Sequence, residues 1–209
     1  KAPNRKKCAD INDSKQIKEG EREALFEQIK KLGEAGELIW ASGQASVEEI
    51  ETENIVGATC LAMKRAMDEV SFKSKKIWSP QEKSENSLFS ALSKNEQGSW
   101  IVSVDGRPMK RLAYIHDGLI KGDTFSLAIA MGSLVAKVTR DRLMRMLAEK
   151  FPAYDFSSNK GYGSPKHLTG LRASGPCPHH RPRFLRNLLG QVVEGKTISP
   201  DKQSQLSFS

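Results

Sequence analysis

Two aspartates stand at junctions between expected structural elements, with basic residues near them in the sequence. Asp105 follows a short β-rich run at 100–104, and a buried strand would deliver it to its carboxyl end, where α/β sheets commonly place their sites. Asp123 follows Lys121 and Gly122 at the start of a long helical pattern. Because carboxylates bind divalent cations, the pattern suggests a metal bound next to a phosphate.

Each aspartate also has an ordinary structural interpretation. Asp105 fits a plain turn after a strand, since a glycine follows it. Asp123 is a favoured N-cap for a helix beginning at Thr124, and a cap role is compatible with a ligand role. We expect Asp13 and Asp141 to cap or pair structurally rather than to bind metal.

Hydrophobic periodicity predicts the elements that would position these residues. Apolar residues recur every three or four positions in several stretches, which is typical of helices that bury one face. The expected helices lie at about 16–32, from a capping box at 46–49, along the stripe at 56–70, which follows or continues that helix, from Asp123 past Val138, in a second stretch at 143–151 before Pro152, between Ser164 and Gly175, and near 184–189. The expected strands lie at 38–41 and 100–104. This alternation favours an α/β class.

The balance of charge points to a polyanionic partner. The chain has 209 residues, 28% of them charged, and a formal net charge of +8. Lys and Arg gain free energy by releasing counterions from nucleic-acid phosphates. No apolar run approaches the roughly 18 residues that a membrane helix requires, so we expect a cytoplasmic protein without a membrane partner.

The cysteines indicate neither a disulfide framework nor a zinc ribbon. Cys8, Cys60 and Cys177 are odd in number and lack C-x-x-C spacing, which favours reduced thiols. His179 and His180 follow Cys177 closely, but no distant fourth ligand accompanies them. We therefore do not expect zinc at this turn.

Several short motifs occur along the chain in one order. They are Asn-Asp-Ser-Lys at 12–15, Asn-Ile-Val-Gly-Ala-Thr at 54–59 with Ala62 and Met63, Val-Asp-Gly at 104–106, Lys-Gly-Asp at 121–123, Ser-Leu-Val-Ala-Lys-Val-Thr-Arg-Asp at 133–141, Lys-Gly-Tyr at 160–162, His167, and His180 with Arg181. In identity and order they resemble bacterial ribonuclease HII over about 11–184. The resemblance implies an α/β fold with an RNase H-like mixed sheet flanked by helices and a small C-terminal helical part.

The resemblance also implies an activity, which is divalent-metal hydrolysis of the RNA strand in RNA/DNA hybrids and at single ribonucleotides in duplex DNA. Members of this family hold Mn²⁺ or Mg²⁺ with four carboxylates, and Asp105 and Asp123 match two of them as catalytic metal ligands. The other two come from a D-E-A-G-R-G strand that this chain does not contain. The missing pair leaves impaired hydrolysis as one expectation, and a non-catalytic hybrid-binding protein or an inactive truncated copy as alternatives. A start of the protein upstream of residue 1 would restore the site.

Five residues match nucleic-acid contacts of the family. The resemblance favours contact between Tyr162 and the nucleotide at the RNA–DNA junction, although a surface ring is the plain alternative. The other four would position phosphates or remain solvated charges. The expected nucleic-acid-binding residues are Lys15, Lys137, Lys160, Tyr162 and Arg181.

The same comparison divides the chain. We expect a disordered basic terminus at 1–10, an RNase H-like catalytic core at 11–152 with an inserted loop at 71–99, a C-terminal helical substrate-binding part at 153–189, and a tail at 190–209. Nothing in the sequence argues for an oligomer, so we expect a monomer.

Overall fold

The computed structural model describes residues 17–75, 80, 82–83 and 101–189. Described residues up to Ala45, together with those of Val56–Val138, form a first unit; Ser46–Ile55 and the residues from Thr139 onward form a second. None of the helices within the described ranges combines enough length and hydropathy to span a membrane. The division after residue 152 that the sequence suggests stays a prediction.

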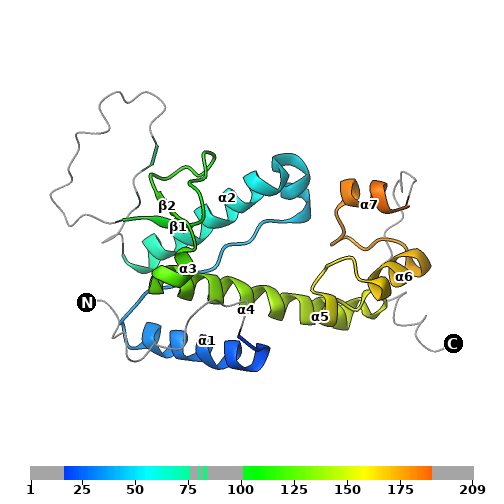
Figure 1. Ribbon diagram of the computed structural model, residues 1–209, viewed down its shortest axis with the longest axis horizontal. Coiled ribbons are helices and arrows are strands. Elements are labelled where there is room, and N and C mark those ends of the chain that lie inside the picture. Colours follow the sequence, from blue (N-terminus) through cyan, green and yellow to red (C-terminus); the bar gives the residue numbers. More distant parts are fainter. Residues whose placement is uncertain (1–16, 76–79, 81, 84–100, 190–209) are drawn as a thin grey trace. The chain divides into compact units, whose positions relative to one another are not determined.

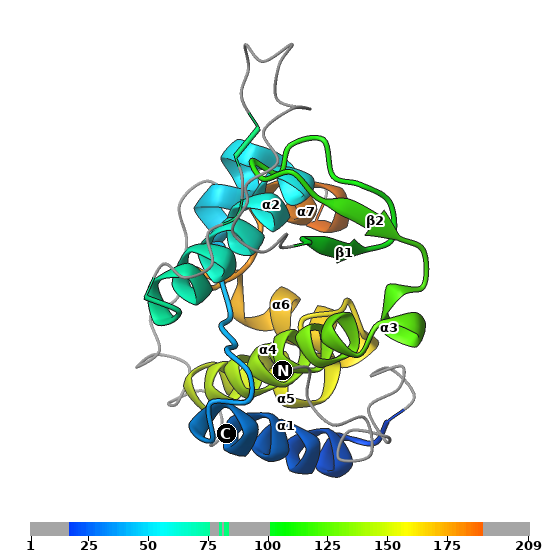
Figure 2. The ribbon, with the colours of Figure 1, turned by 90° about the vertical axis from the view of Figure 1, so that its left-hand side faces the viewer.

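The main core of the first unit lies between α1 (Glu19–Glu34) and the first half of α4 (Leu127–Lys150). Figures 1 and 2 show α1 running alongside α4. Apolar residues three and four positions apart bring one face of each helix into this core. The buried residues are Leu25, Phe26, Ile29, Leu32, Ala130, Leu134, Val135 and Val138. The helices expected near 16–32 and after Asp123 are therefore confirmed, and the second stretch expected at 143–151 is the continuation of α4.

A small parallel sheet stands before α4 in the chain. Strand β1 (Ser103–Asp105) pairs with β2 (Asp117–Leu119), and Val104 lies opposite Gly118. Val104 is buried in a second cluster with Cys60 and Leu112. Figure 2 shows the two strands side by side. Helices with a small sheet agree with the α/β class.

Helix α2 (Val47–Lys73) begins with the predicted capping box. The Ser46 backbone N–H donates to Glu49 at 2.8 Å, and the Glu49 N–H donates to the Ser46 hydroxyl at 3.2 Å. The helix is kinked at Asn54, where φ is 58° and ψ is 174°. The kink falls where the two units divide, so the first turns of α2 belong to the second unit.

The second unit is built around Tyr154, which is fully buried. After α4 come a 3-10 helix η2 (Pro152–Tyr154), α5 (Phe156–Asn159), α6 (Pro165–Ser174) and α7 (Pro182–Leu189). Ser164 caps α6 by accepting a bond from the His167 N–H at 3.2 Å. The predicted α6 boundaries, with Ser164 before and Gly175 after, are confirmed. Cys177 is buried in the same cluster.

The strand expected at 38–41 is wrong, since this segment has no regular structure. Leu38 and Trp40 pack against the α1/α4 core instead, and the Trp40 ring lies 5.3 Å from that of Phe26. The apolar residues of this segment are therefore explained by burial against the helices and not by pairing in a sheet. The other strand is shorter than expected and begins at Ser103. The terminus at 1–10, the tail at 190–209 and most of the expected loop at 71–99 lie outside the described residues.

Candidate active site

The exposed carboxylate of Asp105 is held against the start of α3 (Gly122–Phe125). Asp105 ends β1, and its Oδ1 accepts the Gly122 N–H at 2.8 Å. Gly122 is buried, and a Cβ there would lie 2.7 Å from Ile129 Cδ1 and 3.4 Å from Asp105 Oδ1. An added Cβ would force the Ile129 side chain to shift, so glycine suits this close approach. The hydrogen bond brings the Asp105 carboxylate to the residue before Asp123.

Asp123 is half-buried and lies inside α3. The expected cap role for Asp123 is wrong, because the N-cap residue of α3 is Lys121. Lys121 adopts a left-handed conformation, with φ 56° and ψ 41°, and turns the chain directly from β2 into the helix. The helix thus begins before Asp123, whose side chain stays available for another role.

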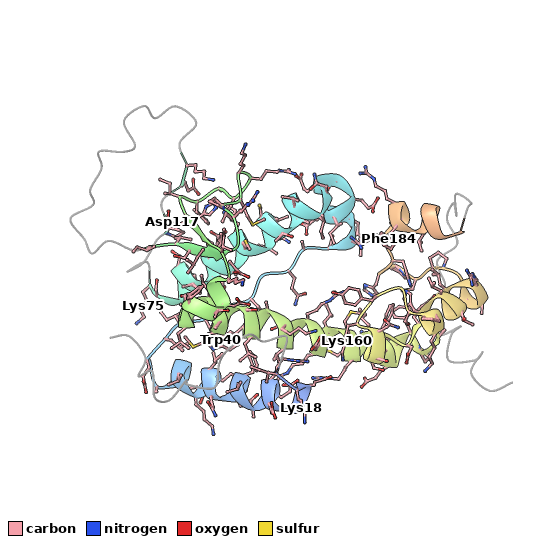
Figure 3. The ribbon with its side chains drawn as sticks, in the orientation of Figure 1. Lys18, Trp40, Lys75, Asp117, Lys160 and Phe184 are labelled. Atoms are coloured by element: carbon pink, nitrogen blue, oxygen red, sulfur yellow. The ribbon has the colours of Figure 1, made fainter. Side chains whose placement is uncertain are left out.

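A third aspartate shares the exposed face of the sheet. Side chains alternate along a strand, so Ser103 and Asp105 face one side and Val104 the other. Asp117 lies opposite Ser103 in the register and is exposed on β2, where Figure 3 labels it. Sequence reasoning missed Asp117. Its signal was the same as that of Asp105, an aspartate followed by glycine.

The donor set limits which ion could bind. Within the residues that the structure describes, no group of three or more His, Cys, Asp or Glu side chains gathers as a metal site. Mg²⁺ is commonly held by one or two carboxylates completed by phosphate oxygens and water. Asp105 and Asp123 supply two carboxylates of this kind, one at the end of β1 and one in the first turn of α3.

A basic cluster with an exposed aromatic ring lies in the second unit. Tyr162 is 79% exposed and follows Gly161, whose φ is 87°. A Cβ on Gly161 would lie 3.3 Å from Arg140 Nη2, so this guanidinium packs against the loop. Loss of hydration lowers the pKa of Arg140; Tyr162 opposes this shift and the nearby charge of Arg181 adds to it. The sequence does not reveal this packing, because Arg140 and Gly161 lie far apart along the chain.

The remaining expected phosphate-binding residues have different surroundings. Arg181 is half-buried, and its guanidinium lies 5.0 Å from the Phe184 ring centre. Lys160, labelled in Figure 3, follows α5 in a left-handed conformation with φ 52°. Lys137 is half-buried on α4 in the first unit. Lys15 lies outside the described residues.

The turn before α7 holds two neutral groups. His180 Nδ1 accepts the Cys177 N–H at 3.0 Å, and burial lowers the His180 pKa to about 4. Burial raises the pKa of Cys177 to about 11. At neutral pH His180 is therefore uncharged and Cys177 is a thiol, which suits neither a nucleophile nor a phosphate contact.

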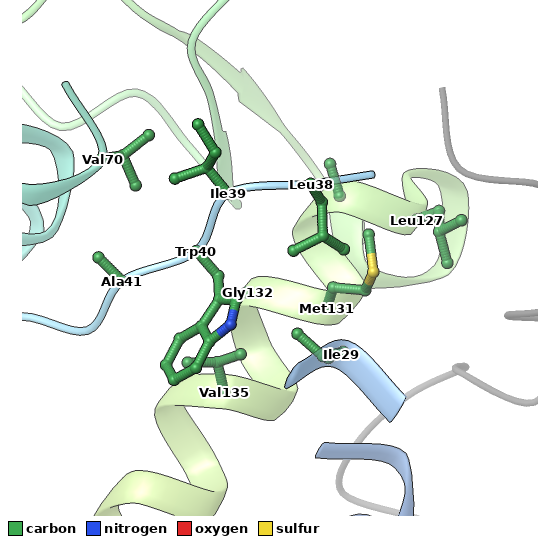
Figure 4. A pocket seen from close by; sticks show the side chains of 11 residues that line it. Ile29, Leu38, Ile39, Trp40, Ala41, Val70, Leu127, Met131, Gly132 and Val135 are labelled. Atoms are coloured by element: carbon green, nitrogen blue, oxygen red, sulfur yellow. The ribbon is translucent and has the colours of Figure 1, made fainter. Parts of the chain in front are cut away.

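A cavity of about 630 Å³ opens in the first unit beside the α1/α4 core. Leu38 and Trp40 point into it toward α4 (Figure 4). The described residues that line it carry no ionisable side chain, and Asp105 and Asp123 are not among them. The lining of this cavity is apolar, so it offers no carboxylate to a metal ion.

Comparison with known proteins gives one consistent result. The family model for ribonuclease HII matches residues 4–187. Ribonuclease HII of Listeria monocytogenes serotype 4b (strain F2365) is 43% identical over 176 residues, which are 83% of this chain and 55% of that protein. The ribonuclease HII of Caldanaerobacter subterraneus subsp. tengcongensis is 38% identical over 180 residues, 86% of this chain and 63% of that protein. The chain thus spans less than two thirds of the length of these relatives.

Proposed function

The chain belongs to the ribonuclease HII family, and from this premise we propose that it is an endonuclease. Its substrates would be RNA/DNA hybrids, in which it hydrolyses the RNA strand, and duplex DNA with single ribonucleotides. The bond from the Gly122 backbone to Asp105 carries the proposal, because it places two metal-binding residue types at adjacent element ends. An RNase H-like mixed sheet around β1 and β2 is part of the same proposal.

The family depends on divalent metal ions. Asp105 and Asp123 would hold Mn²⁺ or Mg²⁺ together with substrate phosphate oxygens and water. A bound ion of this kind neutralises charge on the phosphate and activates water for attack. The two aspartates would bind the metal ion through their carboxylate oxygens and so orient it toward the substrate phosphate.

The basic cluster would position the duplex. Lys160 and Arg181 would bind phosphates, as would Lys137 and Lys15, which gives affinity without reading sequence. The exposed ring of Tyr162 would contact the nucleotide at the RNA–DNA junction. Cleavage on the 5′ side of the ribonucleotide would leave a 3′-hydroxyl.

The test is an end-labelled DNA duplex with one ribonucleotide, beside an all-DNA duplex of the same sequence. We expect cutting of the first duplex alone, in Mg²⁺ or Mn²⁺ and not in chelator. Asp105→Asn and Asp123→Asn should each lose cutting while retaining a cooperative thermal transition. No cutting by folded wild-type protein at high concentration would overturn catalysis.

A non-catalytic hybrid-binding protein is the second candidate. It is favoured by the observation that the described residues gather no group of three metal-binding side chains. This function predicts salt-sensitive duplex binding that persists in chelator without any cutting. Loss of binding on metal removal would exclude it.

A further inference from the structure

The ring of Tyr162 stands on a tightly turned loop rather than on a packed surface. Lys160 and Gly161 both adopt left-handed conformations, with φ of 52° and 87°. The Tyr162 N–H donates to the Asn159 carbonyl at 2.9 Å, which closes the turn. The ring itself is 79% exposed, so few neighbours hold it, and the turn sets the direction of its Cα–Cβ bond.

The side chain of Asn159 stabilises this turn. Its side chain is buried, with 9% exposure, and makes two bonds. Nδ2 donates to the Tyr154 carbonyl at 2.7 Å, and Oδ1 accepts the Gly161 N–H at 2.7 Å. An amide offers a donor and an acceptor on one planar group, so Asn159 joins η2 to the turn in a single orientation.

His167, which follows the loop in α6, binds the same Tyr154 carbonyl oxygen. Its Nδ1 donates to the Tyr154 carbonyl at 2.9 Å, and it is 6% exposed. The Tyr154 hydroxyl donates in turn to the Gly175 carbonyl at 2.6 Å. The turn is therefore anchored to a fully buried residue from both sides.

We infer that Asn159 is a positioning residue that fixes the Tyr162 ring for contact with the nucleotide. The inference rests on the proposed function. A surface ring that is already oriented loses less conformational freedom when a base or sugar packs on it. Without the amide, the Gly161 N–H has no protein acceptor at the turn, and the ring samples other directions.

The first test is binding in chelator to a duplex with one ribonucleotide and to the matching all-DNA duplex. Asn159→Ala should reduce the preference for the ribonucleotide duplex by about fivefold or more, because stacking on an aromatic ring contributes at least that much. Asn159→Asp keeps only the oxygen that accepts the Gly161 N–H, so it should reduce this preference less than Asn159→Ala. Ser158→Ala, at an exposed neighbouring position, is the control that should change neither affinity.

A double-mutant cycle separates positioning from general stability. In a Tyr162→Ala background, Asn159→Ala should cause no further loss of preference. Equal losses in both backgrounds, or equal losses on both duplexes, would overturn the inference.

A second test needs no nucleic acid. Proton exchange of the Gly161 amide should be at least about tenfold faster in Asn159→Ala, since a local hydrogen bond is lost. With fluorotyrosine, the resonance of Tyr162 should shift while that of Tyr114, in the first unit, stays in place. Unchanged exchange and resonances would overturn positioning. If wild-type protein shows no preference for the ribonucleotide, the proposed function fails, and this test still decides what Asn159 does to the loop.

Discussion

At the scale of single residues, a side chain at Gly122 would displace Ile129 beside the Asp105 carboxylate. Gly122→Ala would place a Cβ 2.7 Å from Ile129 Cδ1 and crowd the Asp105 carboxylate. We expect a loss of about 1–3 kcal/mol in unfolding free energy, as for other overpacked sites. Denaturant unfolding measures it.

The same contact supplies a control for that prediction. Ile129→Val removes the nearest methyl group, so it should restore part of the stability in the Gly122→Ala background. Exposed Gly132 has no heavy atom within 4 Å of an added Cβ, and Gly132→Ala should not destabilise the protein. A large loss at Gly132, or none at Gly122, would contradict the packing described here.

His180 gives a pH dependence of stability. Burial lowers its folded-state pKa from an ordinary 6.5 to about 4, so in this range the unfolded chain binds more protons than the folded one. Unfolding free energy should therefore fall as the pH drops from 6.5 to 4. His180→Asn, which retains an acceptor for the Cys177 N–H, should flatten this slope in denaturant titrations at several pH values. Parallel slopes for both proteins would refute the assignment.

The sequence could single out candidate site residues, whose roles stay predictions, but it could not show which side chains lie next to them. Asp105 and Tyr162 could be proposed as candidates because an Asp-Gly after a strand and a tyrosine between glycines are local signals. The packing of Arg140 against Gly161 depends on how the chain returns after α5. The cap role of Asp123 was wrong because Lys121 takes a left-handed conformation that the sequence does not require.

At the scale of elements, the capping box at the start of α2 should contribute measurably to the free energy of unfolding. Ser46→Ala removes the acceptor for the Glu49 N–H and should cost about 1 kcal/mol. Glu49→Ala removes the reciprocal bond to the Ser46 N–H. The double variant should cost less than the sum of the two single ones, because the bonds share one turn. Strict additivity in urea unfolding would show that the two bonds act independently.

Elements with regular periodicity could be predicted, and irregular ones could not. Apolar spacing located α1 and α4, and the Ser164-Pro165 pair located α6. The segment at 38–41 has the apolar character of a strand, yet a strand also needs a hydrogen-bonded neighbour, which apolarity does not reveal. Whether the stretch at 56–70 follows or continues the helix from the capping box was open in the sequence, and the structure continues it through a kink at Asn54.

At the scale of the whole molecule, the net charge of +8 should make duplex binding depend on salt. Arg181→Ala should reduce the slope of log affinity against log salt by about 1, if this residue contacts one phosphate. Lys31→Ala, exposed on α1, is the charge-matched control and should leave the slope unchanged. Fluorescence anisotropy at several salt concentrations measures both. Equal slopes for both variants would remove Arg181 from the phosphate contacts.

Charge and the order of the motifs predicted a nucleic-acid enzyme family over about 11–184, because both can be read without knowing which residues are in contact. The partition of the described residues into two units was not predicted, since it divides α2 and α4 internally. Helical periodicity in the sequence shows which face of a helix is buried, but it does not show which elements each turn packs against.

The buried cysteines Cys60 and Cys177 allow the local unfolding of each unit to be followed by thiol labelling. Cys60 is 5% exposed in the first unit and Cys177 is 1% exposed in the second. In a Cys8→Ser background, a thiol reagent can reach either sulfur only when its own surroundings open, so the two labelling rates measure two local opening equilibria. We expect both rates to lie far below that of the denatured chain. Unequal rates would show that the protein opens in parts, and a single stability would then not describe it.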